Sequence, residues 1–244
     1  MNTDGRRIYA IGDVHGCREA LARRHAQIRD DLAKNPTERD ALLVHLGDYV
    51  DRGPDSRGVV EDLMSFEMPG VEMHCIKGNH DHMLLRFLAA PEEMHCPYHY
   101  LTPNVGGPKT LASYGVGEGR MMDVHAAALA AVPQAHRDFL ATRPLTLRAG
   151  SYLFVHAGIR PGVPLAEQEE QDLIWIRAPF LDSTDNHGFV VVHGHTPVDD
   201  IEVHQNRIAV DTGAVFGNRL SCLVLEGDEL WLLDEWGRQP LTPP

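Results

Sequence analysis

Short apolar runs alternate with longer amphipathic segments along the first third of the chain. Each run has the length of a buried strand and leads directly into a polar loop, and the runs lie at 8–11, 41–46 and 71–76. We expect a helix after each loop, at 17–34, 56–66 and 81–89. Because strand, polar loop and helix occur three times in succession, the pattern predicts a parallel sheet with helices packed on it.

The middle of the chain is irregular, and the second half is rich in strand-forming residues. Prolines and glycines fill residues 91–120, where we expect an irregular excursion with some helix that acts as a lid over the site. Residues 123–142 predict two short helices separated by Pro133. Runs rich in Val, Leu and Ile follow at 145–156, 189–193, 207–211, 222–226 and 229–233. They predict a mixed or antiparallel sheet packed on the first, before a loose tail at 238–244.

These patterns predict an α/β fold in which two mixed β-sheets pack as a sandwich flanked by helices. The length of 244 residues suits a single domain, residues 1–244. The chain has no run approaching the roughly 18–20 apolar residues that cross a bilayer, and no apolar signal-peptide region near its start. We therefore expect a cytoplasmic protein with no membrane partner.

Charge and cysteine content restrict the partners and the compartment further. The 35 acidic and 22 basic residues give a net charge of −13, which repels phosphate backbones and argues against a nucleic-acid partner. Cys75 and Cys222 lie in apolar runs and are expected in the core. All four cysteines are widely spaced and predict reduced thiols: Cys17, Cys75, Cys96 and Cys222.

Five polar clusters stand directly after apolar runs, where ligands bind in α/β folds: GDVHG (12–16), GDYVDRG (47–53), GNHD (78–81), HAG (156–158) and HGHT (193–196). They supply the oxygen and nitrogen donors Asp13, His15, Asp48, Asn79, His156 and His195. Without a thiolate, this set predicts two divalent metal ions, with Mn expected and Fe or Zn suited to the same donors. Asp48 is the only such donor from its strand, which predicts that it bridges both ions.

The order and spacing of these clusters resemble the phosphoprotein phosphatase (PPP) family of calcineurin-like metallophosphoesterases, and especially its bacterial serine/threonine phosphatases. The resemblance extends from about residue 7 to 235 and includes the stretches HAGIRPG (156–162), DLIWIRAPF (172–180) and IAVDTGAVFG (208–217). It implies the calcineurin-like metallophosphoesterase fold and a metal-dependent phosphomonoester hydrolase. The implied substrate is a phosphoprotein or a small phosphomonoester.

The resemblance implies a role for each metal ligand and for the groups around the phosphate. Asp13 and His15 bind the first ion, Asp48 bridges, and the second ion is completed by Asn79, His156 and His195. A hydroxide between the two ions attacks phosphorus in line. His80 gives a proton to the leaving alkoxide and Asp51 orients it. The groups implied to hold phosphate oxygens are Arg52, Arg177 and Asn79.

Two other functions remain open on the same residues. A diadenosine tetraphosphatase-like nucleotide hydrolase shares the core, but such enzymes tend to lack an aspartate at the place of Asp51 in GDYVDRG. That difference favours the monoesterase, because a nucleotide leaving group needs less help from an acid pair. A silent binding module would be expected to have lost at least one of these residues, and the chain keeps them all.

Several neighbouring side chains have structural alternatives. Asp51 and Arg52 could form a salt bridge within their own loop. Arg160 could reach phosphate or could fix its loop. Four residues of the 91–120 segment could contact substrate or line an exposed loop: His95, Tyr98, His99 and Tyr100. We expect core, loop or supporting roles for His45, His74, His82, His193 and Asp211.

Overall fold

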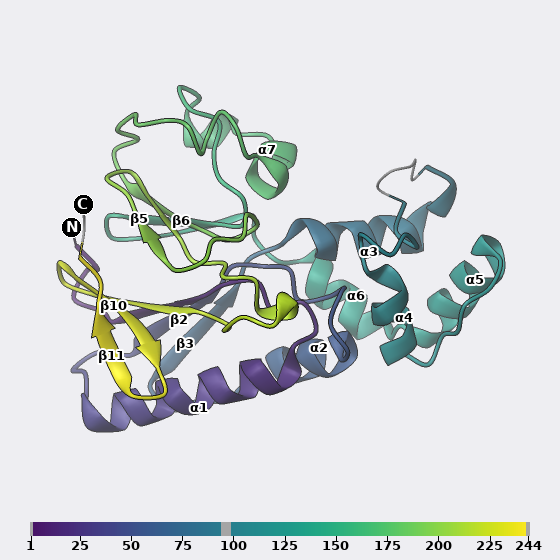
Figure 1. Ribbon diagram of the computed structural model, residues 1–244, viewed down its shortest axis with the longest axis horizontal. Coiled ribbons are helices and arrows are strands. Elements are labelled where there is room, and N and C mark those ends of the chain that lie inside the picture. The colour runs from purple at the N-terminus through teal and green to yellow at the C-terminus, as the bar shows by residue number, and fades with distance from the viewer. Residues whose placement is uncertain (1, 94–98, 243–244) are drawn as a thin grey trace.

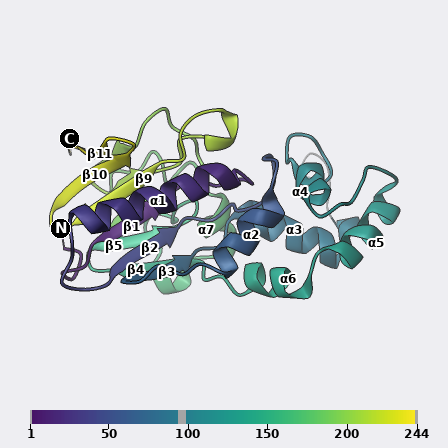
Figure 2. The same cartoon turned by 90° about the horizontal axis from the view of Figure 1, so that it is seen from below.

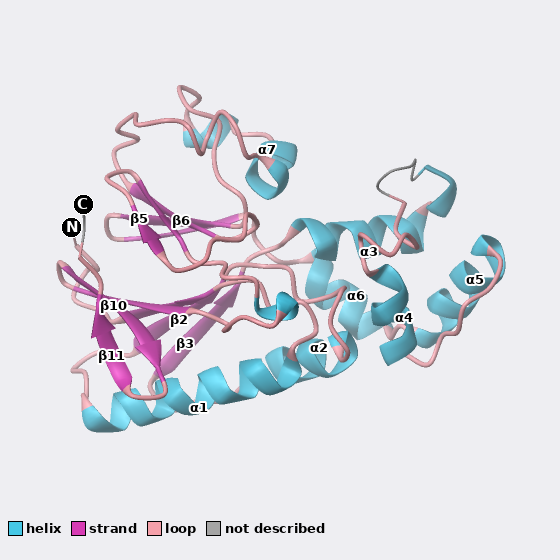
Figure 3. Ribbon diagram, viewed as in Figure 1, coloured by secondary structure: helices cyan, strands magenta, loops and turns pink. Residues whose placement is uncertain are grey.

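Two β-sheets pack face to face between layers of helices in the computed structural model, which describes residues 2–93 and 99–242 (Figure 1). Strands gather at one end of the molecule and helices α3 to α6 at the other (Figure 3). This arrangement confirms the predicted α/β sandwich flanked by helices. None of the described helices is both long and apolar enough to cross a membrane.

The first sheet has six strands in the order β11-β10-β9-β1-β2-β3. Strands β1, β2 and β3 run parallel, as predicted, whereas β9, β10 and β11 are antiparallel to their neighbours. The strands are β1 (Ile8–Ile11), β2 (Ala41–His45), β3 (Val71–Cys75), β9 (Cys222–Glu226), β10 (Glu229–Asp234) and β11 (Gly237–Pro240).

Two expectations about the C-terminal region are wrong. The runs at 222–226 and 229–233 do not join the second sheet, because β9 pairs with β1 of the first sheet, with Ile8 opposite Leu225. The start of the tail is not loose either, because Arg238 to Pro240 form β11. The Arg238 guanidinium fixes this strand by donating to both carboxylate oxygens of Asp31 at 2.8 Å.

The second sheet has five strands in the order β4-β5-β6-β8-β7 and is mixed, as predicted. Its strands are β4 (Thr146–Ala149), β5 (Tyr152–Val155), β6 (Val190–His193), β7 (Glu202–Val203) and β8 (Arg207–Ala209). The predicted run 145–156 is therefore a hairpin of two antiparallel strands with a turn at Gly150.

Successive side chains of each strand point to opposite faces of the sheet, and this divides the core into layers. Ile8 and Ala10 of β1 face the second sheet, where they join a buried cluster with Phe154. Tyr9 and Ile11 face the opposite way, into a cluster shared with the helices. Helix α1 crosses that face of the first sheet (Figure 2). The helices on this side are α1 (Arg18–Lys34), α2 (Ser56–Met64) and α3 (Asn79–Ala89).

The remaining helices lie beyond the sheets. Pro133 separates α5 from α6, as predicted. The short elements are η1 (Pro91–Glu93), α4 (Gly107–Ser113), α5 (Met121–Ala131), α6 (Gln134–Ala141), η2 (Leu165–Glu167), α7 (Glu170–Trp175) and η3 (Ala214–Phe216). Part of the 91–120 excursion, residues 94–98, lies outside the described residues, as does Cys96. Cys75 and Cys222 are buried free thiols, which confirms that prediction.

The buried ion pair of Arg238 with Asp31 ties the last strand to α1, so Arg238→Ala is expected to destabilise the fold. Asp31 would lose two charged hydrogen bonds while staying buried, and we expect the free energy of unfolding to fall by about 2–3 kcal/mol in urea titrations. The control is Arg23→Ala, because Arg23 meets Glu19 only at an exposed surface and should change stability by less than about 0.5 kcal/mol. Equal losses in the two variants would contradict this assignment.

Candidate active site

The ends of four strands and the start of α3 bring the six predicted metal ligands together. Asp13 and His15 follow β1, Asp48 follows β2, and His156 and His195 follow β5 and β6. Asn79 opens α3, which begins two residues earlier than predicted because Asp81 in its first turn accepts a hydrogen bond from the Gly78 N–H at 2.9 Å. Five of the six side chains are buried and His195 is half-buried: the buried ones are Asp13, His15, Asp48, Asn79 and His156.

Asp48 stands at the centre of the cluster. Its Oδ2 lies 3.4 Å from Nε2 of His15, and its Oδ1 lies 3.5 Å from Nε2 of His156. Two groups of side chains are close enough to hold a metal ion, one made by His15, Asp48 and His80 and the other by Asp13, Asp48 and His156. Asp48 belongs to both, which makes the cluster a candidate dinuclear metal centre.

The imidazoles are oriented as metal ligands usually are. The Nδ1 of His15 lies 2.8 Å from the Val50 carbonyl, and that of His156 lies 2.8 Å from the Leu46 carbonyl. Because a carbonyl only accepts, each Nδ1 carries the proton and each Nε2 turns a lone pair to the centre. The Nε2 of His156 then faces the Asn79 side-chain oxygen at 2.7 Å. Two lone pairs so close together fit a cation placed between them.

Burial and charge favour the protonation states that bind metals. Burial lowers the pKa of His15 and of His195 to about 3, so both imidazoles are neutral near pH 7. Burial alone would raise the pKa of Asp48, but the surrounding imidazoles, His156 foremost, hold it below its usual value. Neutral imidazoles and an ionised carboxylate are the forms that coordinate metals. Burial and nearby carboxylates also raise the pKa of Asp13 well above its usual range, and a dication would offset that repulsion.

The backbone of the cluster is strained. Left-handed backbone is uncommon for residues other than glycine, yet five residues of the motifs adopt it, with φ between 43° and 73°: His15, Asp48, Asp51, Arg52 and His195. The Gly78 backbone also approaches the Asp48 side chain so closely that a side chain does not fit at residue 78, because a Cβ there would lie 2.1 Å from Oδ1 of Asp48. Strain of this kind concentrates at functional sites, where the surrounding structure over-determines it.

His80 and Asp51 form a buried pair beside the cluster. The Nδ1 of His80 lies 2.8 Å from Oδ2 of Asp51. The other oxygen of Asp51 accepts hydrogen bonds from the Tyr100 hydroxyl at 2.6 Å and the Thr110 hydroxyl at 2.8 Å. The carboxylate of Asp51 is thus committed to His80 and two hydroxyls, which disfavours the alternative of a loop salt bridge with Arg52.

The two arginines take different positions. Arg52 donates to Nε2 of His15 at 2.6 Å and is partly buried at the edge of the cluster. Arg177 is exposed in the loop after α7, near enough to His195 for its charge to contribute to the lowered pKa of that imidazole. Arg52 therefore takes the lone pair of His15 that a metal ion would use, whereas Arg177 acts on the cluster through its charge.

The structure decides several of the open alternatives. Arg160 fixes its own loop through two hydrogen bonds to Asp172, at 2.6 and 2.7 Å. His193 is a core residue packed on Phe180. Tyr100 is fully buried and so lines no exposed loop, whereas His95 and Tyr98 lie outside the described residues.

Three supporting residues were missed by reasoning from the motifs. Asp81 is buried and accepts hydrogen bonds from the backbone N–H groups of Asp48 and Tyr49, both at 3.0 Å. Its place within GNHD was the one available signal. Tyr100 and Thr110 bind Asp51 from 49 and 59 residues away, and no local pattern links them to it.

Proteins similar to this chain include a protein phosphatase and several bis(5'-nucleosyl)-tetraphosphatases. The family model described as calcineurin-like phosphoesterase matches residues 6–226. The chain is 28% identical to serine/threonine-protein phosphatase 1 of Salmonella typhimurium over 231 residues, which cover 88% of this chain and 90% of that protein. It is 36% identical to the symmetrical bis(5'-nucleosyl)-tetraphosphatase of Methylococcus capsulatus over 158 residues, which cover 63% of this chain and 44% of that protein.

Two solved structures share the fold at low sequence identity. A chain described as a candidate diadenosine tetraphosphatase superposes with a TM-score of 0.66 at 22% identity and covers 95% of both chains. A cold-active protein tyrosine phosphatase superposes with a TM-score of 0.64 at 17% identity and covers 98% of this chain and 79% of its own. At these identities the likeness concerns the fold alone.

Because Asp48 is shared by both candidate groups, Asp48→Asn is expected to weaken the binding of two Mn²⁺ ions together. His156→Ala should weaken one binding event and leave the other, since His156 belongs to one group only. We expect losses of more than about 100-fold in affinity, measured by isothermal titration calorimetry with Mn²⁺. The control is His74→Ala, because His74 pairs with Glu72 away from the cluster. Unchanged binding in Asp48→Asn would rule out a shared carboxylate.

Proposed function

We propose that this chain, which belongs to the calcineurin-like phosphoesterase family, is a metal-dependent serine/threonine phosphatase acting on phosphoproteins and small phosphomonoesters. The observation that carries the proposal is the buried pair of His80 and Asp51, whose Nδ1 and Oδ2 lie 2.8 Å apart. A serine or threonine alkoxide is a poor leaving group, so its departure needs a proton donor. An acid pair is therefore expected where the substrate is an alkyl monoester.

Six side chains would hold the metal ions: Asp13, His15, Asp48, Asn79, His156 and His195. When bound, two divalent ions lower the pKa of coordinated water and neutralise negative charge on the phosphoryl group. The two oxygens of Asp48 lie 3.4 Å from Nε2 of His15 and 3.5 Å from Nε2 of His156, which supports two ions rather than one and does not need His80 as a ligand. We expect Mn²⁺, although Fe or Zn suits the same oxygen and nitrogen donors.

His80 is assigned to proton donation rather than to metal binding. Its Nδ1 is engaged by Asp51, which leaves Nε2 to carry the proton that passes to the leaving oxygen. Burial alone would lower the pKa of His80, but the carboxylates of Asp48 and Asp51 raise it and so favour the protonated form. A positioned proton donor of this kind typically contributes about 10²–10⁴-fold to the rate.

The remaining roles concern the phosphate. The guanidinium of Arg52, 2.6 Å from His15, and that of Arg177 place positive charge on the side where a phosphoryl oxygen would approach. Charge-assisted hydrogen bonds from arginine to phosphate oxygens are strong and directional. The Asn79 amide lies between His156 and His195, and we assign it to binding both a metal ion and a phosphate oxygen.

The alternative is hydrolysis of a dinucleoside tetraphosphate, as the names of several relatives state for those proteins. The leaving group in that reaction is itself a phosphate, which departs with less help from an acid. The complete pair of His80 and Asp51, held by two further hydroxyls, supports the monoesterase instead.

His80→Asn is expected to lower kcat for a phosphothreonine peptide by about 10²–10⁴-fold, because the leaving alkoxide loses its proton donor. Hydrolysis of p-nitrophenyl phosphate should fall much less, because nitrophenolate leaves readily without a proton. Both rates are measured with Mn²⁺, and diadenosine tetraphosphate is assayed as a third substrate. Calorimetry should find that His80→Asn retains Mn²⁺ binding. Wild-type turnover confined to the dinucleotide would replace the proposal by its alternative.

Tyr100→Phe is expected to act through the same pair. Asp51 would lose one of the two hydroxyl donors on Oδ1, which loosens its hold on His80, and kcat for the phosphothreonine peptide should fall about tenfold. The rate for p-nitrophenyl phosphate should change by less than about twofold. The matched control is Tyr114→Phe, because the hydroxyl of Tyr114 bonds His136 and not Asp51. An equal loss on both substrates would indicate general damage rather than a misplaced proton donor.

A further inference from the structure

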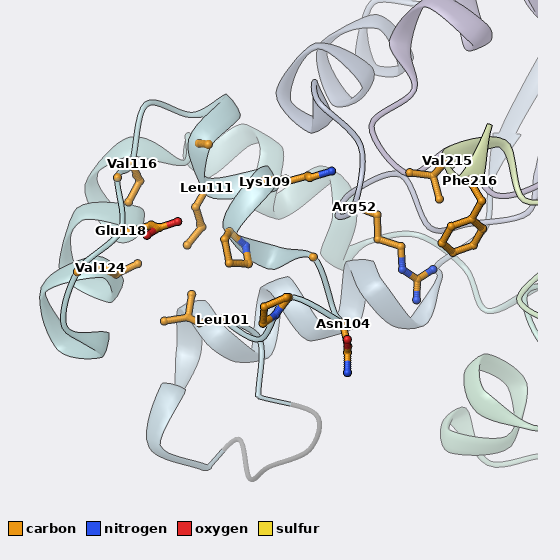
Figure 4. Close-up of a pocket in the computed structure, with 16 residues that line it drawn as sticks. Arg52, Leu101, Asn104, Lys109, Leu111, Val116, Glu118, Val124, Val215 and Phe216 are labelled. Carbon is orange, nitrogen blue, oxygen red and sulfur yellow. The ribbon is translucent and has the colours of Figure 1, made fainter.

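A cavity of about 1020 Å³ opens beside Arg52 and extends along α4 toward Val124 (Figure 4). Arg52 and Phe216 stand together at one end of it, and Leu101, Leu111 and Val124 stand at the other. The walls come from the loop before α4, from α4 itself, from the start of α5 and from η3. Arg52, which is assigned to the phosphate, is therefore part of the lining of this cavity.

The lining is mostly apolar, and Phe216 is the one aromatic residue among its described members. Phe216 is 66% exposed, and it differs from the other exposed apolar side chains of the described residues in lining this cavity. The guanidinium carbon of Arg52 lies 5.8 Å from the centre of the Phe216 ring. This contact sets the aromatic wall of the cavity directly beside a cation assigned to the phosphate.

We propose that the cavity binds the apolar side chain of a residue next to the phosphorylated serine or threonine of a protein substrate. The inference rests on the proposed phosphatase function and names the substrate class more narrowly. A phosphate near Arg52 would place the adjoining peptide over Phe216, and the next side chain would pack against Phe216 and Val215 at this end of the cavity. Burial of that side chain supplies binding free energy that a small monoester lacks.

The same lining fits a dinucleotide less well. A tetraphosphate chain carries several negative charges and needs several cationic partners. Among the described lining residues the cations are Arg52 and Lys109, and the carboxylate of Glu118 lies in the same wall. Asn104 is the one neutral polar side chain of the described lining, and the aliphatic side chains offer no partners for the polar edge of a nucleobase. An apolar peptide side chain can pack against this lining without additional cationic residues.

The test compares two phosphothreonine peptides that differ only in the residue after the phosphothreonine, which is Leu in one and Asp in the other. The wild type should prefer the Leu peptide by about tenfold in kcat/KM, chiefly through KM. Phe216→Ala should reduce that preference to about twofold, and Phe216→Leu should restore part of it. Activity on p-nitrophenyl phosphate reports any disturbance of Arg52, which lies 5.8 Å from the Phe216 ring and would affect all substrates alike, so the ratio between the two peptides isolates the contribution of the cavity.

The matched control is Trp236→Ala, because Trp236 is 79% exposed in the turn between β10 and β11 and does not line the cavity. Equal kcat/KM for the two peptides in the wild type would overturn the cavity proposal and leave the phosphatase proposal standing. Absence of turnover on either peptide, with p-nitrophenyl phosphate still hydrolysed, would remove the phosphatase proposal and this one with it. A raised KM for diadenosine tetraphosphate alone in Phe216→Ala would assign the cavity to a nucleobase.

Discussion

The carboxylate of Asp81 holds the loops that carry the candidate centre. It is fully buried and accepts hydrogen bonds from the N–H groups of Gly78, Asp48 and Tyr49 at 2.9 to 3.0 Å. Those N–H groups belong to the loops after β2 and β3, so one side chain closes both loops and starts α3. Without it, three buried donors would lack a partner, and each would cost about 1–3 kcal/mol. The position of Asp48, and therefore that of the cluster, depends on these hydrogen bonds to Asp81.

The cluster is costly for the fold in the absence of a cation. The left-handed backbone at residues such as Asp48 and Asp51 stores strain, and the neighbouring carboxylates of Asp13 and Asp211 repel each other at low dielectric. The two sheets offset this cost through a continuous apolar core on either side of β1. A divalent ion would convert the repulsion into attraction, which couples metal binding to the stability of the same loops.

Most of the centre could be predicted because its ligands directly follow apolar runs. Asp13 comes two residues after the end of β1 and Asp48 three residues after the end of β2, and parallel strands deliver such residues to one edge. Long-range strand pairing could not be predicted, because the pattern of apolar and polar residues within β9 does not specify which strand β9 pairs with. For the same reason β9 to β11 were placed in the wrong sheet. The hydroxyls on Asp51 were missed because their spacing in sequence follows no local period.

The described part of the 91–120 segment contacts both the pair of His80 and Asp51 and the cavity lined by Arg52 and Phe216. Tyr100 and Thr110 bind Asp51 on one side, while Leu101 and Leu111, each the next residue along the chain, line the cavity. Neighbouring side chains of one segment thus support the proton donor and form the wall that would recognise the substrate. A change in the position of α4 would alter both together, so under the proposed roles specificity and proton transfer would be coupled through its packing. The role of the segment as a lid stays a prediction, whereas these contacts make it a structural part of the site.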